Sequence, residues 1–350
     1  MSVRRSGSRA GVWLRAAAVL FAGSTVLATA AGTPTLQRFE YVEPHMGTTF
    51  RMVLYARTAT QADRAVTAAY ARIAELDARL SDYRDSSELS QLTKRAVGRP
   101  IPVSRDLFRI LEAGQRLAVK TDGAFDLTVG PLTRLWRRAH RQGQLPPEQE
   151  LADARAVTGY KKLVLNRRAR TARVAVPGMR LDAGGIAKGY AADAALAVLG
   201  QHGIRRALVA AGGDIRMGEP PPESPGWQIV LAGLDPERSA PGSPLTLSNC
   251  GVSTSGDAEQ WVEIDGRRYS HIVDPRTGLG LTGHRSVTVV AANAMTSDML
   301  ATAVTVLGPR EGIALVDSHP DAAALVGVVA ATGEEWHQSR RWDQAGISGQ

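Results

Sequence analysis

The chain has 350 residues, of which 44% are hydrophobic and 22% are charged, so it can bury a sizeable core like an ordinary globular protein. This composition excludes a collagen, a multi-span membrane protein and a chain that is disordered throughout. The net charge of +8 by itself favours a nucleic-acid or anionic-membrane partner, while the single cysteine, Cys250, excludes intramolecular disulfides and cysteine-rich zinc sites.

Residues 1–30 have the pattern of an export signal. They contain four arginines and no acidic residue, and the arginines lead into an uncharged apolar stretch that ends in a small-x-small cleavage sequence, Ala28-Thr29-Ala30. We expect an exported, periplasmic protein with one folded domain over 31–350; a leader that stays uncleaved and tethers the chain to the inner membrane is the alternative. The four arginines supply half of the net charge, so the charge gives no support for a nucleic-acid partner.

Helical and strand patterns are mixed along the rest of the chain. Apolar spacings of three and four residues, and the ends that bound them, predict helices over 60–80, 105–120, 185–199 and 296–307. Apolar and β-branched runs predict strands at 48–55, 206–211, 227–231, 261–264, 268–272, 286–291 and 323–329. Because Asp265-Gly266 predicts a hairpin between two of these strands, we expect an α+β fold of antiparallel sheets with packed helices.

Residues 278–283 satisfy the spacing G-x-G-x-x-G of dinucleotide-binding proteins. That motif needs a preceding strand and a following helix. Here a proline-containing turn precedes the glycines and a predicted strand follows them. The sequence therefore argues against a dinucleotide-binding fold of that kind.

Two segments combine chemical side chains with tight turns. In 180–193 (RLDAGGIAKGYAAD), glycines at the start of a helix let the backbone approach a ligand, and Asp182 and Lys188 can meet a base, a ribose or a phosphate. In 271–278 (HIVDPRTG), a turn brings His271 close to an acid and an arginine, where the histidine can act as a general base. An ordinary helix start and a rigid turn are the respective alternatives.

Asp298 and Thr302 are four residues apart on a predicted helix, so their oxygens lie on one face. Hard oxygen ligands at this spacing suit Mg²⁺, which binds through few protein groups and the phosphates of a substrate. The alternative is an acid that the helix dipole favours in the first turn.

Three aromatic or thioether side chains provide surfaces for a flat ring system. They are Met46, Tyr83 and Phe125. Side chains of these types more often belong to the core, so this pattern is the least specific of the four.

The combination of motifs resembles the FAD:protein FMN transferase (ApbE) family. The resemblance runs from about His45 to about Val329. The matching segments, in the family's order, are HMGT, SDYRDSSELS, TDGAFDLTVGPL, RLDAGGIAKGYAAD, AAGGDIR, STSG, YSHIVDPRTG and TSDMLATAV. The resemblance implies an enzyme that cleaves the FAD pyrophosphate, attaches FMN to a Thr or Ser hydroxyl of a partner flavoprotein and releases AMP.

The resemblance also implies roles for individual residues. His271 would be the base near the attacked phosphorus. The main-chain carbonyl of Gly185, with Asp298 and Thr302, would hold Mg²⁺. The residues that would contact FAD are Met46, Tyr83, Ala124, Phe125, Asp126, Asp182, Lys188 and Ile272. Two alternatives stay open: a Mg²⁺-dependent FAD pyrophosphatase that gives FMN and AMP, and an exported flavin-binding protein without turnover.

Overall fold

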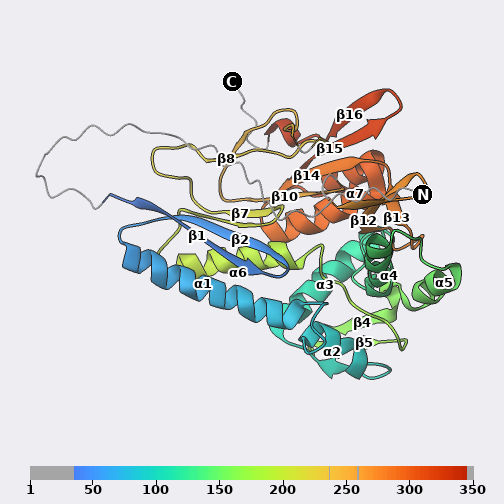
Figure 1. The fold of residues 1–350 in the computed structure, drawn as a ribbon. Helices are drawn as coiled ribbons and strands as arrows, with labels where there is room; N and C mark the ends of the chain where they lie inside the picture. Colours follow the sequence, from blue (N-terminus) through green and yellow to red (C-terminus); the bar gives the residue numbers. More distant parts are fainter. Residues whose placement is uncertain (1–34, 236, 258–259, 345–350) are drawn as a thin grey trace, which may run out of the picture.

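The computed structural model describes residues 35–235, 237–257 and 260–344; the predicted export signal lies outside them. These residues form an α+β fold around an eight-stranded antiparallel sheet with strand order β1-β2-β6-β7-β10-β14-β15-β16 (Figure 1). The strands of this sheet are β1 (Gln37–His45), β2 (Thr48–Ala56), β6 (Ala207–Ala211), β7 (Asp214–Met217), β10 (Gly251–Gly256), β14 (Arg285–Ala291), β15 (Ala322–Ala330) and β16 (Gly333–Gln338).

Seven helices and three small sheets complete the described part of the chain. The helices are α1 (Ala59–Leu80), α2 (Glu88–Arg95), α3 (Arg105–Lys120), α4 (Gly130–Gln142), α5 (Glu148–Val157), α6 (Ala187–Gln201) and α7 (Ala294–Asp317). The small sheets are β11 (Trp261–Ile264), β12 (Arg267–Val273) and β13 (Gly280–Thr282); β3 (Ile101–Pro102), β5 (Thr171–Val174) and β4 (Leu163–Asn166); and β8 (Trp227–Ile229) and β9 (Leu245–Leu247).

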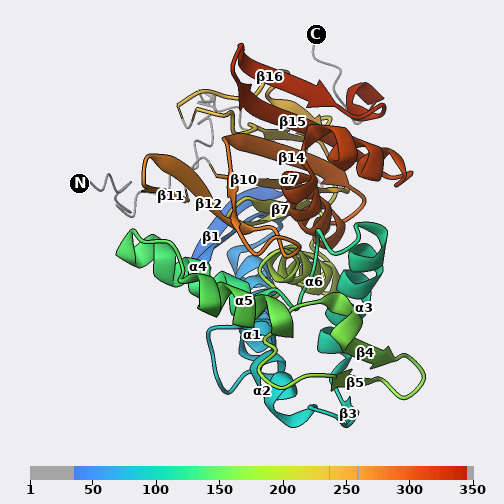
Figure 2. The same ribbon diagram turned by 90° about the vertical axis from the view of Figure 1, so that its right-hand side faces the viewer.

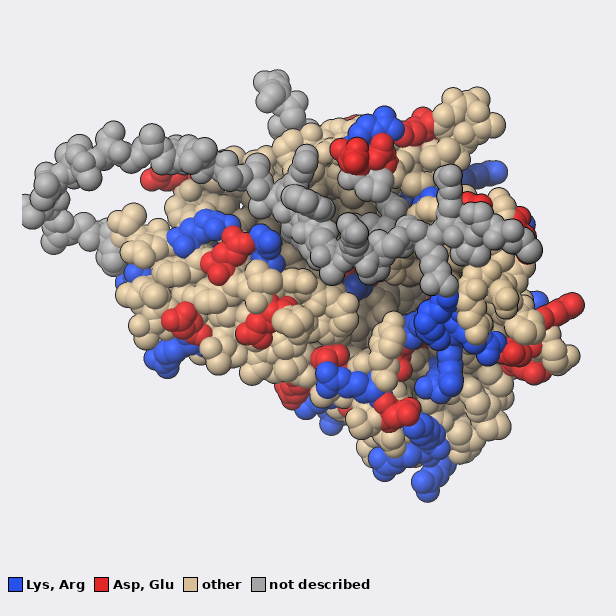
Figure 3. Space-filling model, in the orientation of Figure 1, with Lys and Arg blue, Asp and Glu red and all other residues tan. Residues whose placement is uncertain are grey.

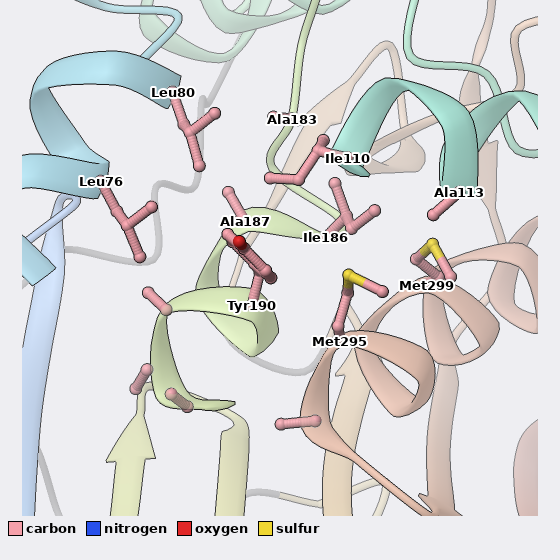
Figure 4. Packing of buried hydrophobic residues seen from close by; sticks show 14 of the residues in the cluster. Leu76, Leu80, Ile110, Ala113, Ala183, Ile186, Ala187, Tyr190, Met295 and Met299 are labelled. Carbon is pink, nitrogen blue, oxygen red and sulfur yellow. The ribbon is translucent and has the colours of Figure 1, made fainter. Parts of the chain in front are cut away.

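Helices α1, α6 and α7 cover one face of the large sheet, and β8 with β9 lies against the other (Figure 1). The alternation of side chains along β2 fits this arrangement. Phe50, Met52 and Leu54 point into the core shared with the helices. Val53 and Tyr55 belong to the hydrophobic cluster on the other face, which includes residues of β8 and β9. The main core lies where α1, α3, α6 and α7 meet, and Figure 4 shows Leu76, Ile110, Tyr190 and Met295 from these four helices pointing toward one another.

The structure confirms the expected fold class and refines several predicted boundaries. The predicted helix over 105–120 is found unchanged, and Asp265-Gly266 forms the expected hairpin with positive φ at both residues. Helix α7 differs in two ways: its N-cap is Asn293, and it continues beyond the predicted end. The backbone is non-helical at Gly308, with φ 79° and ψ −179°, so the predicted stop is an interruption after which the helix resumes.

Among the described residues, α7 is the one helix with the length and apolar composition to cross a membrane. It packs against α6, β10 and β14 in this fold, and most of its first half is buried. Such core helices pass the same test of length and composition, so α7 is explained by its position in the core.

Two glycines of the same helix provide a test of the α6–α7 contact. A Cβ at Gly189 would lie 2.2 Å from the Ala294 carbonyl oxygen, whereas a Cβ at Gly200 would meet nothing within 4 Å. We expect Gly189→Ala to lower the free energy of unfolding by about 1–3 kcal/mol because backbone must move. Gly200→Ala should raise it by up to about 1 kcal/mol through helix propensity. Urea unfolding measures both, and equal effects would contradict the close contact.

Candidate active site

Helices α6 and α7 hold each other through carboxylates in their second turns. The Asp193 carboxylate on α6 accepts hydrogen bonds from the backbone N–H groups of Ala294 and Met295, each at 2.9 Å. In return, Asp298 Oδ2 on α7 accepts from the backbone N–H of Gly189 at 3.1 Å. Because each helix supplies an acceptor to the other, their relative position along the two axes is fixed.

This contact brings together the three residues that the resemblance implies as metal ligands. Gly185 precedes α6 and lies so close to Thr302 that a Cβ there would be 2.7 Å from Thr302 Oγ1. Asp298 lies one helical turn before Thr302, and its side chain is buried. Carboxylate, hydroxyl and carbonyl oxygens are the donors that Mg²⁺ prefers, so the residues fit the ion. The described residues contain no group of three His, Cys, Asp or Glu side chains that could hold a metal. Mg²⁺ is commonly bound through few protein groups together with water and the phosphates of a substrate.

Lys188 lies beside the oxygen atoms of Gly185, Asp298 and Thr302, which we call the oxygen group. Its Nζ donates to the Gly184 carbonyl oxygen at 2.9 Å, is 2.9 Å from Asp214 Oδ2 and is 3.8 Å from Asp298 Oδ2. Although burial opposes the charge, the two carboxylates raise the pKa of Lys188 above its usual value. Burial, and after it the charge of Asp214, raises the pKa of Asp298. A buried charge cluster of this kind is typical of a functional site.

Asp214 is a member of the site for which the sequence predicted no role. It is buried at the start of β7, directly after the turn that joins β6 to β7. The segment AAGGDIR that contains it was part of the family resemblance. The ion pair with Lys188 depends on a sheet strand meeting a helix start, which the local sequence alone does not indicate.

His271 lies on β12, and its Nδ1 is 3.1 Å from the Gln260 carbonyl oxygen. The ring reaches solvent, yet protein atoms surround it closely enough to lower its pKa below the usual 6.5, and the charge of Lys188 acts in the same direction. A carbonyl oxygen only accepts hydrogen bonds, so in the neutral ring Nδ1 carries the proton that points toward Gln260. Nε2 is then the basic nitrogen. The neighbouring Ile272 is half-buried, and its predicted contact with FAD stays a prediction.

Asp182 is held by three donors, one of which is a cation. Its Oδ1 accepts from the Gly184 N–H at 2.8 Å, and its Oδ2 accepts from Thr133 Oγ1 at 2.8 Å and from Arg137 Nη2 at 2.9 Å. The guanidinium of Arg137 also lies 4.3 Å from the centre of the Tyr83 ring. The structure thus brings two predicted FAD-contacting residues, Tyr83 and Asp182, together through an arginine that the sequence did not single out.

The remaining predicted contacts are more enclosed. Ala124, Phe125 and Asp126 are buried, and Phe125 belongs to the main core. Asp126 Oδ1 accepts from the N–H and the hydroxyl of Thr128, both at 2.8 Å. Met46 is at the β1–β2 turn with φ 50° and packs partly against the core. Contact of these four residues with FAD stays a prediction.

Solved structures of the same class have this architecture. The flavin transferase ApbE from Vibrio cholerae superposes with a TM-score of 0.79 at 30% identity, covering 88% of this chain and 99% of that one. The apo flavinyl transferase ApbE from Pseudomonas stutzeri gives 0.79 at 30% identity, covering 90% and 99%. The class that the fold and the site define is therefore the ApbE-type α+β protein.

Sequence comparison gives the same result. A model of the ApbE family matches residues 46–326. The chain is 33% identical over 263 residues to the FAD:protein FMN transferase of Haemophilus influenzae, covering 72% of this chain and 75% of that protein. The Vibrio cholerae protein of the same name is 31% identical over 280 residues, with 79% and 83% covered. The chain belongs to the ApbE family, and the resemblance seen in its motifs is confirmed.

Removal of the Asp193 carboxylate tests the contact between α6 and α7. In Asp193→Ala the N–H groups of Ala294 and Met295 lose their acceptor, and we expect the free energy of unfolding to fall by about 1–3 kcal/mol. Hydrogen exchange at these two amides should become faster. Ser104→Ala, which removes the cap of α3, is the control and should speed exchange near Leu107 instead. Unchanged exchange at 294 and 295 in Asp193→Ala would argue against the contact.

Proposed function

We propose that the chain is an FAD:protein FMN transferase that attaches FMN to a Thr or Ser hydroxyl of a partner flavoprotein and releases AMP in a Mg²⁺-dependent reaction. Its enzyme class is confirmed by the curated relatives, which favours an enzyme over the flavin-binding protein without turnover. The observation that carries the proposal is the meeting of Gly185, Asp298 and Thr302 at the α6–α7 contact. Export to the periplasm is part of the proposal and rests on residues 1–30.

The proposed reaction replaces the phosphoanhydride bond of FAD by a phosphate ester bond to the acceptor. The acceptor oxygen forms a bond to the phosphorus of the FMN half, the bond from this phosphorus to the bridging oxygen breaks, and AMP leaves. His271 Nε2 takes the proton of the acceptor hydroxyl, because its lowered pKa keeps it neutral near pH 7. Lys188, held by Asp214, places a fixed positive charge beside the phosphates. Mg²⁺ bound to the oxygen group would neutralise charge on the departing phosphate.

Mass spectrometry of an acceptor protein tests the reaction class. The full-length chain is co-expressed with a candidate acceptor flavoprotein, and one Thr or Ser of the acceptor should gain the mass of FMN. In parallel, the enzyme is incubated with FAD and Mg²⁺ without acceptor. Rapid release of FMN and AMP in that arm, with an unmodified acceptor in the first, would favour the FAD pyrophosphatase instead.

Asp298→Ala should abolish FMN transfer while the protein remains folded, because the oxygen group loses its carboxylate. The measurement is in-gel flavin fluorescence of the acceptor as a function of Mg²⁺ concentration. Asp235→Ala removes an exposed acid that pairs with Arg238, and it should transfer like the wild type. A near wild-type rate for Asp298→Ala at saturating Mg²⁺ would overturn the metal assignment.

His271→Ala should still bind FAD but transfer FMN about 10²–10⁴-fold more slowly, because the acceptor hydroxyl loses its base. The pH profile provides a second readout. The neutral imidazole is the active form, so kcat/KM of the wild type should fall as the pH drops below 6.5 through the lowered pKa of His271. The slow residual rate of His271→Ala should lack this acid limb. Loss of FAD binding in the variant would make His271 a binding residue instead.

A further inference from the structure

Arg137 lies between two carboxylates that come from separate parts of the fold. It is on α4, with Nη1 donating to Asp82 Oδ2 at 2.5 Å and Nη2 donating to Asp182 Oδ2 at 2.9 Å. Asp82 follows α1, and Asp182 lies in the segment that leads into α6. The two carboxylates are 14% and 8% exposed, and the arginine is 33% exposed. The pair is therefore more enclosed than an ordinary surface ion pair.

The two carboxylates would repel each other without this arginine. Burial, and then the charge of Asp182, raises the pKa of Asp82, while Arg137 lowers it. Three of the acceptor positions of the Asp182 carboxylate are filled, by the Gly184 N–H, the Thr133 hydroxyl and Arg137. Asp182 thus fixes the arginine and the approach to α6, and its predicted contact with FAD stays a prediction.

Tyr83 is the third partner of Arg137. The guanidinium carbon is 4.3 Å from the ring centre, the distance of a cation–π stack. Tyr83 is nevertheless 75% exposed, so the guanidinium covers one face of the ring while the other is open to solvent. The loop that carries Tyr83 is tied down at both ends, with Ser87 Oγ donating to the Ser81 carbonyl oxygen at 2.6 Å and Arg84 pairing with Asp77 at 2.7 Å. The exposed face of the Tyr83 ring is therefore held in a fixed orientation.

We propose that Arg137 is a positioning residue that holds the Tyr83 ring as a stacking platform for a fused planar ring of the ligand. The inference rests on the proposed function, in which the ligand is FAD and carries two such rings, isoalloxazine and adenine. The arginine acts through Tyr83, because its guanidinium covers the inner face of the ring and holds the ring in place. Tyr83 therefore loses little further side-chain freedom when a ligand stacks on its open face. Lys and Arg side chains gather near α4 on the face shown in Figure 3, and Arg137 differs from them in its buried acidic partners.

The neighbouring arginine provides a matched control. Arg138 is on the same helix and is 39% exposed, but it pairs with Glu150 of α5 instead of with Asp82 or Asp182. Arg137→Met and Arg138→Met therefore remove the same charge and the same side-chain length from adjacent positions. Arg137→Lys keeps the charge but loses the planar fork that can bind two carboxylates and stack at once.

The test is a set of titrations with the full-length chain, followed by flavin fluorescence for FAD and FMN and by calorimetry for AMP. We expect Arg137→Met to weaken FAD binding about tenfold, Tyr83→Leu to do the same, and Arg138→Met to bind like the wild type. The double variant Arg137→Met/Tyr83→Leu should be no weaker than either single variant, because both remove one platform. In turnover, the KM for FAD should rise while kcat at saturating FAD stays unchanged.

The arms with FMN and AMP identify the ring that stacks on Tyr83. The nucleotide whose binding weakens in Arg137→Met carries that ring, and if neither weakens the inference is overturned. Additive effects in the double variant would also overturn it. If Arg137→Met fails to fold, Arg137→Lys replaces it and is expected to lose most of the same affinity; wild-type affinity in Arg137→Lys would reject the stacking role. A wild-type chain that binds FAD but never modifies an acceptor would refute the proposed function and leave this inference standing.

Discussion

The close approach of α6 and α7 is the constraint on which the site depends. Gly189 has no side chain because the Ala294 carbonyl occupies the space that a Cβ would need, and Gly185 is similarly close to Thr302. At that separation, backbone N–H groups at the start of one helix come within reach of carboxylates on the other, as the contacts of Asp193 and Asp298 show. Asp298 thus both stabilises the helix pair and belongs to the oxygen group. Gly185 and Gly189 allow the helices to approach, and they belong to this group or lie next to Lys188.

The charge arrangement follows from the same constraint. Bringing Asp298 and Asp214 into a buried region is unfavourable, and Lys188 compensates for both. Lys188 brings one positive charge to two carboxylates, so the cluster favours a further positive charge. A divalent ion fits this imbalance, while the exposed part of the lysine remains available to an anionic ligand.

Local patterns in the sequence were sufficient for much of the fold. Helices α1 and α3 have regular apolar spacing and Thr or Ser caps, and they lie where they were predicted. Strand β7 was missed because it has four residues and follows the turn at Gly212-Gly213, and β10 was missed because its sequence GVSTSG contains no apolar run. Helix α4 was also missed, although Leu132, Trp136 and Ala139 form its buried stripe.

The site likewise contains residues that a local pattern indicates and residues that only long-range packing brings together. Asp298 and Thr302 share one helix face, so their spacing alone indicated that they act together. The partners Asp214 and Arg137 could not be found in this way, because Asp214 is 26 residues from Lys188 and Arg137 is 45 residues from Asp182. Contacts at such separations are set by how helices and strands pack. The quoted motifs contained Asp214 but gave no reason to pair it with a lysine.

The segment from Asp182 to Lys188 links the two halves of the site. Its first residue holds Arg137 and thereby the Tyr83 ring, and its last residues provide Gly185 and the lysine beside Asp298. α4 also lies against β12, the strand of His271 (Figure 2). A ligand that joins a planar ring to phosphates can therefore place its ring at Tyr83 and its phosphates at α6 while it follows a single short stretch of chain. Because this stretch is anchored at both ends, the fold fixes the separation between the Tyr83 ring and the oxygen atoms of Gly185, Asp298 and Thr302.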